Sequence, residues 1–512
     1  MSTGTADNPT DLHPAPDLAT LLDEQRRGFL AEGPPTAAVR RDRIDRLVAM
    51  VLDNRDAYVD ALSTDFGTRS RTGTLFTEIM GMLSVIEHTR AHVDKWMKPR
   101  NPKPGARLYG IRAEVQPTPL GVVGIIGPWN FPLNLVVLPA AAAFAAGNRV
   151  MIKMSEIAGH TAELTRSLAS SYFDPTEFAV VTGGADVAAE FSALPFDHLF
   201  FTGSTRVGKL VQRAAAENLV PVTLELGGKN PVVVAPDADV HRSAERIARA
   251  RMVNGGQVCV CPDYVYVPAD RIDAFTVTLQ STLRAMFPTV VGNDDYTACV
   301  DTANYERILA LLDDARARGA RIEPVAPVGE ILPDPATRKI APTVVRDVTD
   351  EMRIATEEIF GPVVLVRPYT SLDEVIDRVN AGPSPLVAYW FGPDGPDFRR
   401  FVRGTRTGGV ARNDFAIHML PDDAPFGGVG HSGMGAYHGK VGFDTFSHHR
   451  TIVGTDLPFA VTAMAAPPFA APTRKIVDLA LNAAHRRSRR RTRGRLPHRT
   501  TDGPTPSGTV TS

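Results

Sequence analysis

Apolar positions along the chain follow two periods, one typical of helices and one typical of buried strands. From about residue 18 to residue 99 they recur at helical spacing between charges, most regularly over 40–62 and 77–96. Later, short apolar runs bounded by glycine and proline predict strands at 122–126, 149–153, 178–181, 197–201, 340–345 and 363–366. Helices are predicted between and after them at 161–170, 207–216, 302–319 and 474–484. Strands that alternate with helices in this way predict an α/β fold.

One segment is apolar enough to suggest a membrane span. Residues 121–147 carry no charge over 27 positions, a length sufficient to cross a bilayer. Pro128, Pro132 and Pro139 interrupt the segment, together with three glycines at its start. We therefore predict a buried strand, a turn and an Ala-rich buried helix.

Charge is unevenly distributed, although the net charge is only −1. Residues 485–499 hold eight arginines and no acidic residue, which makes the tail basic and the remainder mildly acidic. Such a cluster binds acidic membrane or nucleic acid weakly, or is a disordered solvated tail. The 3 cysteines form no disulfide framework and the first residues do not resemble a signal peptide, so we expect a cytoplasmic protein. Peripheral attachment to a membrane through the tail is the alternative.

Two of the cysteines, Cys259 and Cys261, follow a Gly-Gly pair that allows close approach of the backbone to a ligand. This is a position suited to a nucleophile. Only about 3% of an ordinary thiol is ionised at pH 7, so such a nucleophile needs activation or compensation. A bond between Cys259 and Cys261 would be strained, and we expect Cys261 to pack as a small apolar residue.

Two further polar residues interrupt apolar surroundings. Glu225 ends an apolar strand just before Gly227 and Gly228, where burial would raise the pKa of its carboxyl and suit it to act as a general base. The alternative is an ion pair with Lys229. Asn130 lies between aromatic residues and prolines, where its amide either stabilises an oxyanion or only closes a turn.

Two strand ends resemble parts of a nucleotide site. Lys153 ends a strand and Glu156 follows it, an arrangement suited to a ribose or phosphate contact at a sheet edge or to a plain salt bridge. Gly203 and Ser204 join another strand to a helix N-terminus, which is a cradle for phosphate. His88 and His92 are spaced as half of a metal site, but no third ligand is near and we predict a solvated helix face and no metal.

Six motifs in order resemble the aldehyde dehydrogenase superfamily, and its class 3 branch of coniferyl and fatty aldehyde dehydrogenases. The resemblance runs from about residue 40 to residue 450. The motifs are GPWNFP (127–132), FTGSTRVG (201–208), LELGGKNP (224–231), NGGQVCVCPDY (254–264), EEIFGPV (357–363) and PFGGVGHSGMGAYHGKVGFDTFSH (425–448). The 34 residues from Glu225 to Cys259 match the spacing expected between base and nucleophile in this family.

The resemblance implies NAD(P)-dependent oxidation of an aldehyde to a carboxylic acid through a thioester. It implies Cys259 as nucleophile, Asn130 as oxyanion donor and Glu225 as the base that activates water. It assigns contacts with the cofactor to Trp129, Lys153, Glu156, Gly203, Ser204, Val207, Leu226, Glu358 and Phe360. Glu156 favours NAD, with NADP as the alternative because Arg149 could meet a 2'-phosphate.

The resemblance also implies an architecture and a homodimer. We expect a Rossmann-like cofactor domain, an α/β catalytic domain and a small β-hairpin oligomerisation element. The expected boundaries are a disordered lead-in at 1–17, a cofactor domain at 18–100 and 120–224, a catalytic domain at 225–430, a hairpin at 101–119 with 443–456, and an extension with a basic disordered tail at 457–512.

The substrate is the least determined feature. The class 3 resemblance favours aromatic or medium-to-long aliphatic aldehydes, but Gly255, Val258 and Cys261 depart from the usual pattern around the nucleophile, and Arg149 and Met154 depart from it beside the cofactor strand. The competing hypotheses are a cysteine-dependent acyl transferase or thioesterase without redox chemistry and an inactive scaffold. The presence of FTGSTRVG and Glu358 argues against the first, because a hydrolase does not need a dinucleotide site.

Overall fold

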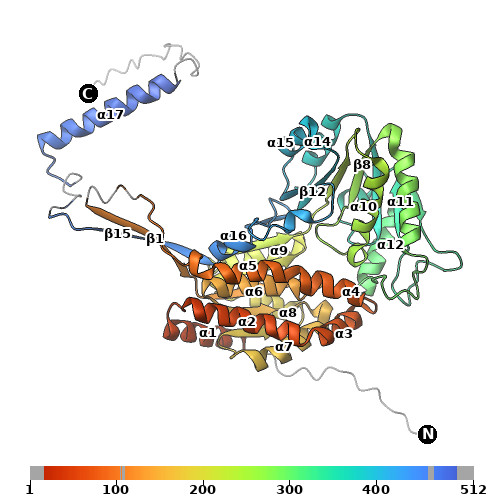
Figure 1. Cartoon of the computed structure of the whole chain (residues 1–512), viewed down its shortest axis with the longest axis horizontal. Helices are drawn as coiled ribbons and strands as arrows, with labels where there is room; N and C mark the ends of the chain where they lie inside the picture. The colour runs from red at the N-terminus through yellow and green to blue at the C-terminus, as the bar shows by residue number, and fades with distance from the viewer. Residues whose placement is uncertain (1–16, 104, 106–109, 459, 461–465, 493–512) are drawn as a thin grey trace, which may run out of the picture. The chain divides into compact units, whose positions relative to one another are not determined.

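The computed structural model describes residues 17–103, 105, 110–458, 460 and 466–492 (Figure 1). The chain divides into two compact units, one within 1–100 and 115–451 and the other within 101–114 and 452–512. The predicted lead-in lies outside the described residues except for its last residue. The predicted division of the larger unit into a cofactor domain and a catalytic domain stays a prediction.

The first sheet of the larger unit has the strand order β14-β6-β5-β2-β3-β4, and β14 is antiparallel to its neighbour. Its strands are β2 (Val122–Ile126), β3 (Arg149–Lys153), β4 (Phe178–Val181), β5 (His198–Gly203), β6 (Val222–Leu226) and β14 (Gly433–Met434). Around it lie α1 (Leu18–Glu32), α6 (Asn134–Ala146), α7 (Gly159–Tyr172), α8 (Ala185–Ala193) and α9 (Thr205–Ala216). The predicted strand, turn and buried Ala-rich helix between residues 121 and 147 are confirmed as β2 and α6.

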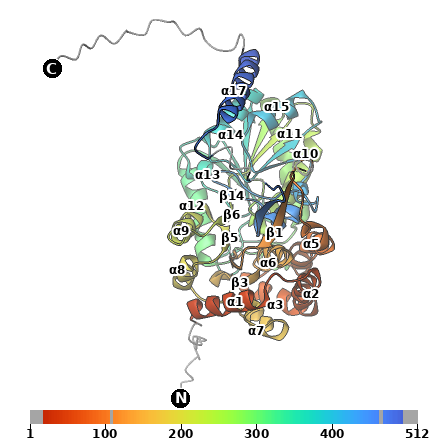
Figure 2. The same cartoon turned by 90° about the vertical axis from the view of Figure 1, so that its left-hand side faces the viewer.

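The second sheet has the order β13-β12-β7-β8-β11-β10-β9, with β9 antiparallel to β10. Its strands are β7 (Pro231–Val234), β8 (Tyr264–Pro268), β9 (Arg321–Pro324), β10 (Thr343–Arg346), β11 (Val363–Tyr369), β12 (Val387–Phe391) and β13 (Gly409–Arg412). The accompanying helices are α10 (Val240–Met252), α11 (Ile272–Met286), α12 (Thr302–Ala317), α13 (Arg353–Thr356), α14 (Leu372–Ala381) and α15 (Pro396–Gly404). Figure 2 shows α10 and α11 side by side next to this sheet. The predicted α/β fold is confirmed.

The helical region before residue 100 differs from the prediction at two places. The helix predicted over 40–62 is two helices, α2 (Ala37–Asp53) and α3 (Arg55–Phe66), because the Asn54 amide donates to Met50 O at 2.9 Å and Asn54 leaves helical geometry. The helix predicted over 77–96 begins as the π-helix η1 (Leu75–Met80), which follows α4 (Arg71–Thr74) and leads into α5 (Gly81–Trp96). Helices α2, α5 and α6 pack against one another beside the first sheet (Figure 1).

Strand order reverses in the first sheet between β2 and β5. From β2 the chain continues outward through β3 and β4, and then returns to the other side of β2 to form β5 and β6. Parallel strands place all their carboxyl ends at one edge, and a reversal of strand order leaves a crevice there. The residues that follow Ile126 and Gly203 are therefore expected to line this crevice.

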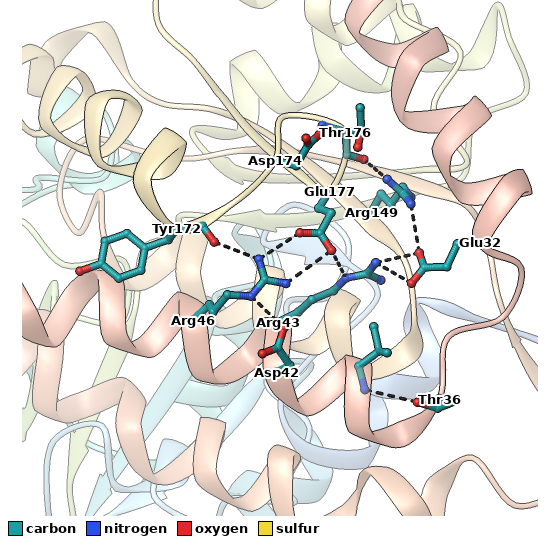
Figure 3. A network of polar contacts seen from close by, with 11 residues as sticks. Glu32, Thr36, Asp42, Arg43, Arg46, Arg149, Tyr172, Asp174, Thr176 and Glu177 are labelled. Carbon is teal, nitrogen blue, oxygen red and sulfur yellow. Dashed lines mark hydrogen bonds and ion pairs between the residues drawn. The ribbon is translucent and has the colours of Figure 1, made fainter.

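The opposite end of this sheet holds a network of charged side chains around the buried Arg43 and Arg149 (Figure 3). Arg43 donates to Glu32 at 2.7 Å and to Glu177 at 3.1 Å, and Arg149 donates to Glu32 at 3.0 Å. Arg149 starts β3, whereas Lys153 ends it. The hypothesis that Arg149 meets a 2'-phosphate is therefore wrong, since its side chain joins α1 to the start of β3, a strand length away from the carboxyl edge.

Two long strands, β1 (Ile111–Pro119) and β15 (Ser447–Thr455), form a separate two-stranded sheet. Helix α16 (Gly439–Thr445) directly precedes β15 in the chain. Helix α17 (Ala471–Thr492) is longer than the predicted helix, because arginine is a good helix former and its charge is favourable near a helix C-terminus. The predicted disorder of the tail is thus wrong as far as residue 492, and residues 493–512 lie outside the described part. Among the described residues, no helix is both long enough and apolar enough to cross a bilayer.

Candidate active site

A cavity of about 790 Å³ lies at the carboxyl edge of the first sheet. It collects every residue that the sequence analysis selected as catalytic or cofactor-binding. These residues are Trp129, Asn130, Lys153, Glu156, Gly203, Ser204, Val207, Glu225, Leu226, Cys259, Glu358 and Phe360. Pockets that hold small ligands and cofactors are typically of this size. Residues from five separate motifs therefore converge on one site, whereas their roles stay predictions.

The Cys259 loop is shaped by three successive residues with positive φ. The φ values are 49° at Asn254, 62° at Gly255 and 80° at Gly256. A Cβ atom at residue 256 would lie 2.1 Å from Gly361 O, so only glycine fits there. The Gln257 side chain then locks the loop, since its amide donates to Ala298 O at 2.9 Å and its carbonyl accepts from Val300 N at 3.0 Å.

Cys259 is partly accessible, and its thiol faces an unfavourable field for ionisation. Burial, with the nearby carboxyl groups of Glu358 and Glu225, raises the pKa of the thiol to about 12. Backbone N–H groups of Cys259 and Val260 act in the opposite direction. The thiol is consequently protonated at neutral pH, and attack on a substrate requires a base to take its proton. Cys261 is buried and packs as predicted, and the cysteines are free.

The Asn130 side chain is 4% exposed and fixed at both ends. Its amide donates to Gln257 O at 3.1 Å, and its backbone carbonyl accepts from Arg69 at 3.0 Å and from Asn254 at 3.2 Å. A side-chain amide has two N–H groups, and the bond to Gln257 uses one of them. The other N–H remains for a ligand in the cavity, which suits an oxyanion donor more than a residue that only closes a turn.

Glu225 lies on β6 opposite Gly433 and is 3% exposed. Neither of its carboxyl oxygens has a hydrogen-bond partner among the described residues. Burial raises the pKa of this carboxyl well above its ordinary value. The alternative pairing with Lys229 is wrong, because Lys229 bonds to Asp263 at 3.0 Å and to Glu357 O at 3.0 Å beyond the Gly227-Gly228 turn.

A second carboxyl group reaches the cavity from the loop after α13. Burial raises the pKa of Glu358 to about 8. Gly227 allows its approach, since a Cβ atom there would lie 2.2 Å from Glu358 Oε2. Arg307 donates to Glu358 O at 3.0 Å and holds the loop. Two residues after Glu358, Phe360 adopts a φ of 52°. Its ring lies edge-on to the Trp129 ring, and the two ring centroids are 5.2 Å apart.

The other end of the cavity is polar. Lys153 Nζ lies 2.9 Å from Glu156 Oε2, so the predicted salt bridge is formed and both residues also line the cavity. Ser204 accepts from Val207 N at 3.3 Å and caps α9, whose N-terminus faces the cavity. At Gly208 a Cβ atom would lie 2.7 Å from Leu226, so glycine lets α9 approach β6 closely. These features would suit an anionic, ribose-containing ligand, and the assignment stays a prediction.

Several supporting residues were not singled out from the sequence. Gln257 could have been found as a polar side chain beside the nucleophile, and Asn230 as a polar residue before an apolar strand. Asn230 donates to Cys259 O at 2.7 Å and to Cys261 O at 3.0 Å. Arg307 carries no such signal, since it lies on an ordinary amphipathic helix. His88 and His92 lie with their ring centroids 4.2 Å apart and are half-buried, so the predicted solvated face is only partly correct. The described residues contain no cluster of three metal-ligating side chains.

Residues 24–452 match the model of the aldehyde dehydrogenase family. The chain is 46% identical over 439 residues to coniferyl aldehyde dehydrogenase of Pseudomonas sp. (strain HR199 / DSM 7063), covering 86% of this chain and 91% of that protein.

Solved structures agree with this match. The substrate-bound state of Staphylococcus aureus AldH superimposes with a TM-score of 0.83 at 34% identity, over 90% of this chain and 99% of that one. An aldehyde dehydrogenase of Mycobacterium tuberculosis complexed with NAD+ gives a TM-score of 0.75 at 28% identity, over 86% and 90% of the two chains.

Proposed function

The chain belongs to the aldehyde dehydrogenase family, and we propose that it oxidises aromatic or medium-to-long aliphatic aldehydes through a covalent Cys259 intermediate. Its family membership makes it an NAD(P)-dependent aldehyde dehydrogenase. The observation that carries the proposed mechanism is the convergence of Cys259, Asn130 and Glu225 on one cavity, with Glu225 left without a partner among the described residues.

The cavity fits a nicotinamide dinucleotide on its own features. The N-terminus of α9 and the buried Lys153 suit phosphate and ribose, and Glu156 suits a ribose hydroxyl. Glu358 and Phe360 line the part next to Cys259, where they would hold the nicotinamide ribose and pack near it. When bound, this group accepts a hydride. Glu156 and the engagement of Arg149 elsewhere favour NAD over NADP.

The first step assigned to the chain is attack by Cys259 Sγ on the aldehyde carbon. The raised pKa of the thiol requires a base, and Glu225 is the carboxyl group with both oxygens free to take the proton. The Asn130 amide and the Cys259 backbone N–H donate to the oxyanion that forms. After loss of hydride and release of the thiol proton from Glu225 to solvent, Glu225 deprotonates the water that hydrolyses the Cys259 thioester and releases the acid.

Magnitudes decide which of these parts matters most for the first step. Lowering a thiol pKa from about 8.5 to about 7 raises the thiolate fraction only about fifteenfold. An oxyanion donor is worth about 100- to 1000-fold. The site of this chain raises the pKa of Cys259, so oxyanion stabilisation by Asn130 has to outweigh a weakly ionised nucleophile.

The substrate class rests on the relatives and on the cavity wall. Leu135, Phe426 and Tyr437 give the wall near Cys259 an apolar and aromatic character. The related Pseudomonas protein is named for coniferyl aldehyde. Benzaldehyde, coniferaldehyde and the series from hexanal to hexadecanal, each with NAD and with NADP, should yield reduced nicotinamide that absorbs in the near ultraviolet. Acyl transfer or thioester hydrolysis without any reduced nicotinamide would support the non-redox alternative and contradict the proposal.

We further propose a homodimer formed through the two-stranded sheet. Strand β15 is exposed beyond its first residue, including Ile452 and Val453, and a lone two-stranded sheet offers unpaired edges. Sedimentation equilibrium of the whole protein should give twice the chain mass. The double substitution Ile452→Asp with Val453→Asp should give a monomer, and an unchanged mass would contradict this assembly.

We also propose weak, salt-sensitive attachment of the tail to acidic membranes. Helix α17 exposes Ile476, Val477, Leu479 and Leu481 ahead of a run of arginines. Co-sedimentation with phosphatidylserine vesicles should fall when residues 485–512 are deleted and should weaken in high salt. Co-sedimentation that is unaffected by the deletion would contradict this role of the tail. Displacement of the vesicles by nucleic acid would favour nucleic acid as the partner of the tail. The cytoplasmic location stays a prediction.

A further inference from the structure

A buried ion pair lies behind the Asn130 turn and outside the cavity. Arg69 Nη2 is 3.0 Å from Glu78 Oε1, and the two side chains are 2% and 0% exposed. Neither residue lines the cavity. Removing two charges from water costs several kcal/mol per ion before their attraction offsets it, so a pair of apolar residues of similar size would often serve stability equally well. Stability alone therefore does not account for this ion pair.

Arg69 is fixed on all sides and reaches Asn130 directly. Its Nη1 donates to Asn130 O at 3.0 Å. The guanidinium lies over the Phe66 ring at 4.7 Å and over the Phe131 ring at 5.3 Å. A planar group between two aromatic rings has little freedom to rotate, because moving it would expose ring faces and break the bond to Glu78. Arg69 therefore presents one N–H at a defined position to the backbone of Asn130.

Glu78 holds the other end of the same turn. Its Oε2 accepts from Asn134 N at 2.8 Å, at the first residue of α6. Leu133, the N-cap of α6, has no side chain that could satisfy the free N–H groups there, so Glu78 replaces the usual capping residue. The Asn134 amide returns a bond to Thr77 O at 3.1 Å. The ion pair thus forms hydrogen bonds to the backbone of residues 130 and 134, the two ends of the turn.

The geometry of the segment that supplies Glu78 is itself unusual. Glu78 belongs to the π-helix η1, and single π-helical turns within α-helices are rare and are frequent at functional sites. In η1 each turn is wider than in an α-helix, and Glu78 on it contacts both Arg69 and the start of α6. A regular helix over the same residues would rotate the positions that follow the bulge relative to those before it.

We propose that Arg69 and Glu78 are positioning residues for the reaction, and that their ion pair sets the place from which the Asn130 amide donates to the oxyanion. This inference rests on the proposed function, because it needs Asn130 to act on an oxyanion. Without Arg69 the Asn130 carbonyl would keep only the bond from Asn254 at 3.2 Å. Displacement of a reacting group by about 1 Å reduces rates about 100-fold, so a partial loosening should give about a 10- to 100-fold loss.

A double-mutant cycle between Arg69 and Asn130 tests this directly. The rate constant to measure is that of the pre-steady-state burst of reduced nicotinamide, with coniferaldehyde and saturating NAD. Arg69→Met should slow the burst about 10- to 100-fold with Asn130 present, and should have no further effect in the Asn130→Ala background. Equal losses in both backgrounds would mean general damage and would overturn the proposal.

Matched variants separate positioning from folding. Arg43→Met removes another buried, ion-paired arginine far from the cavity and should lower the melting temperature while leaving the burst rate unchanged. Alkylation of Cys259 by iodoacetamide should proceed at the wild-type rate in Arg69→Met, because the nucleophile loop is held by other residues. A tenfold change in alkylation would indicate a distorted loop and contradict the proposed route through Asn130.

The two levels of the proposal fail in different ways. If Asn130→Ala alone leaves the burst unchanged, the oxyanion role falls and the positioning role falls with it. If Asn130→Ala slows the burst and Arg69→Met does not, only the positioning role falls. Should Arg69→Met not fold, Glu78→Gln is tested in the same cycle, because it keeps the size of the side chain and removes the charge that orients Arg69; the same expectation and the same contradiction apply to it.

Discussion

The carboxyl groups at the two ends of the first sheet differ in their hydrogen-bond partners. At the amino end, both oxygens of Glu32 and both oxygens of Glu177 accept hydrogen bonds from arginines (Figure 3). At the carboxyl end, neither oxygen of Glu225 has a partner among the described residues. Both ends belong to the same strands, separated by one strand length. Paired carboxylates hold the molecule together at one end, and at the other end a buried carboxyl without a described partner is retained where chemistry needs it.

The two ends also respond to pH with opposite signs. At Glu177 burial raises the pKa, but hydrogen bonds from Arg46 and the charge of Arg43 outweigh it and the pKa is lowered. Its contribution to stability is present above the unfolded pKa and is lost as pH falls through the folded pKa. Burial raises the pKa of Glu358 to about 8, so its contribution is present in acid and is lost as pH rises from about 4.5 through about 8.

The largest effect is expected from loss of the nucleophile at the unsatisfied end. Cys259→Ala should reduce kcat for aldehyde oxidation at least about 10⁴-fold, because no other described thiol lines the cavity. Its melting temperature should stay close to that of the wild type, since the substitution removes one sulfur atom from a partly accessible position. Steady-state assays with coniferaldehyde and thermal unfolding check the two statements, and residual activity near the wild-type level would contradict the covalent mechanism.

Loss of the oxyanion donor should have the next largest effect. Asn130→Ala should slow thioester formation about 100- to 1000-fold, which exceeds what any change in thiol pKa could produce. The burst of reduced nicotinamide reports this step. Asn130→Asp, of almost equal size, is the control, since a carboxylate repels an oxyanion and should be at least as slow. A burst within fifteenfold of the wild type in both variants would assign the effect to the thiol.

A substitution at the satisfied end should change stability and spare catalysis. Glu177→Gln leaves Arg43 and Arg46 with a neutral partner and should lower the free energy of unfolding by about 1–3 kcal/mol at pH 7. The acid side of the stability profile should flatten, because the lowered pKa of this carboxyl is removed. Denaturant unfolding between pH 3 and pH 7 measures both, and a lower burst rate in the folded protein would break the contrast between the two ends.

The smallest effect on activity is expected at Arg149. Because its side chain bonds to Glu32 and to Thr176 O at the amino end, Arg149→Met should leave the ratio of kcat/KM for NAD and NADP within about twofold of the wild type. Steady-state kinetics with both cofactors tests this. A selective rise in KM for NADP would reinstate the contact with a 2'-phosphate.

The sequence was informative wherever function and local geometry are written into adjacent residues. Glycines beside Cys259, Glu225 and Ser204 indicated where backbone and ligand approach each other, and all three residues line the cavity. Strands β2 to β5, β10 and β11 were also predicted, because buried parallel strands are continuous apolar runs, whereas most strands of the second sheet were not. The roles of these residues and the domain boundaries stay predictions.

The features that escaped prediction depend on individual side-chain partners that the apolar pattern does not reveal. The break at Asn54 follows from one side-chain bond that competes with the helix. The pair of Arg69 with Glu78 depends on a π-helix, which no periodicity of apolar residues signals. Arg149 was misassigned although it is the first residue of the predicted strand, and its actual partner Glu32 is 117 residues away in the chain.

The central claim is that the unpartnered carboxyl of Glu225 serves the hydrolysis of the thioester. Rapid mixing of Glu225→Gln with coniferaldehyde and saturating NAD tests it most directly; because Glu225 also takes the thiol proton, the burst itself should be slower than in the wild type. We expect about one reduced nicotinamide per active site followed by turnover slowed about 100- to 10,000-fold, with the acyl group still on Cys259 in the mass of the intact protein. Steady turnover at the wild-type rate, with no acyl group retained, would contradict the account.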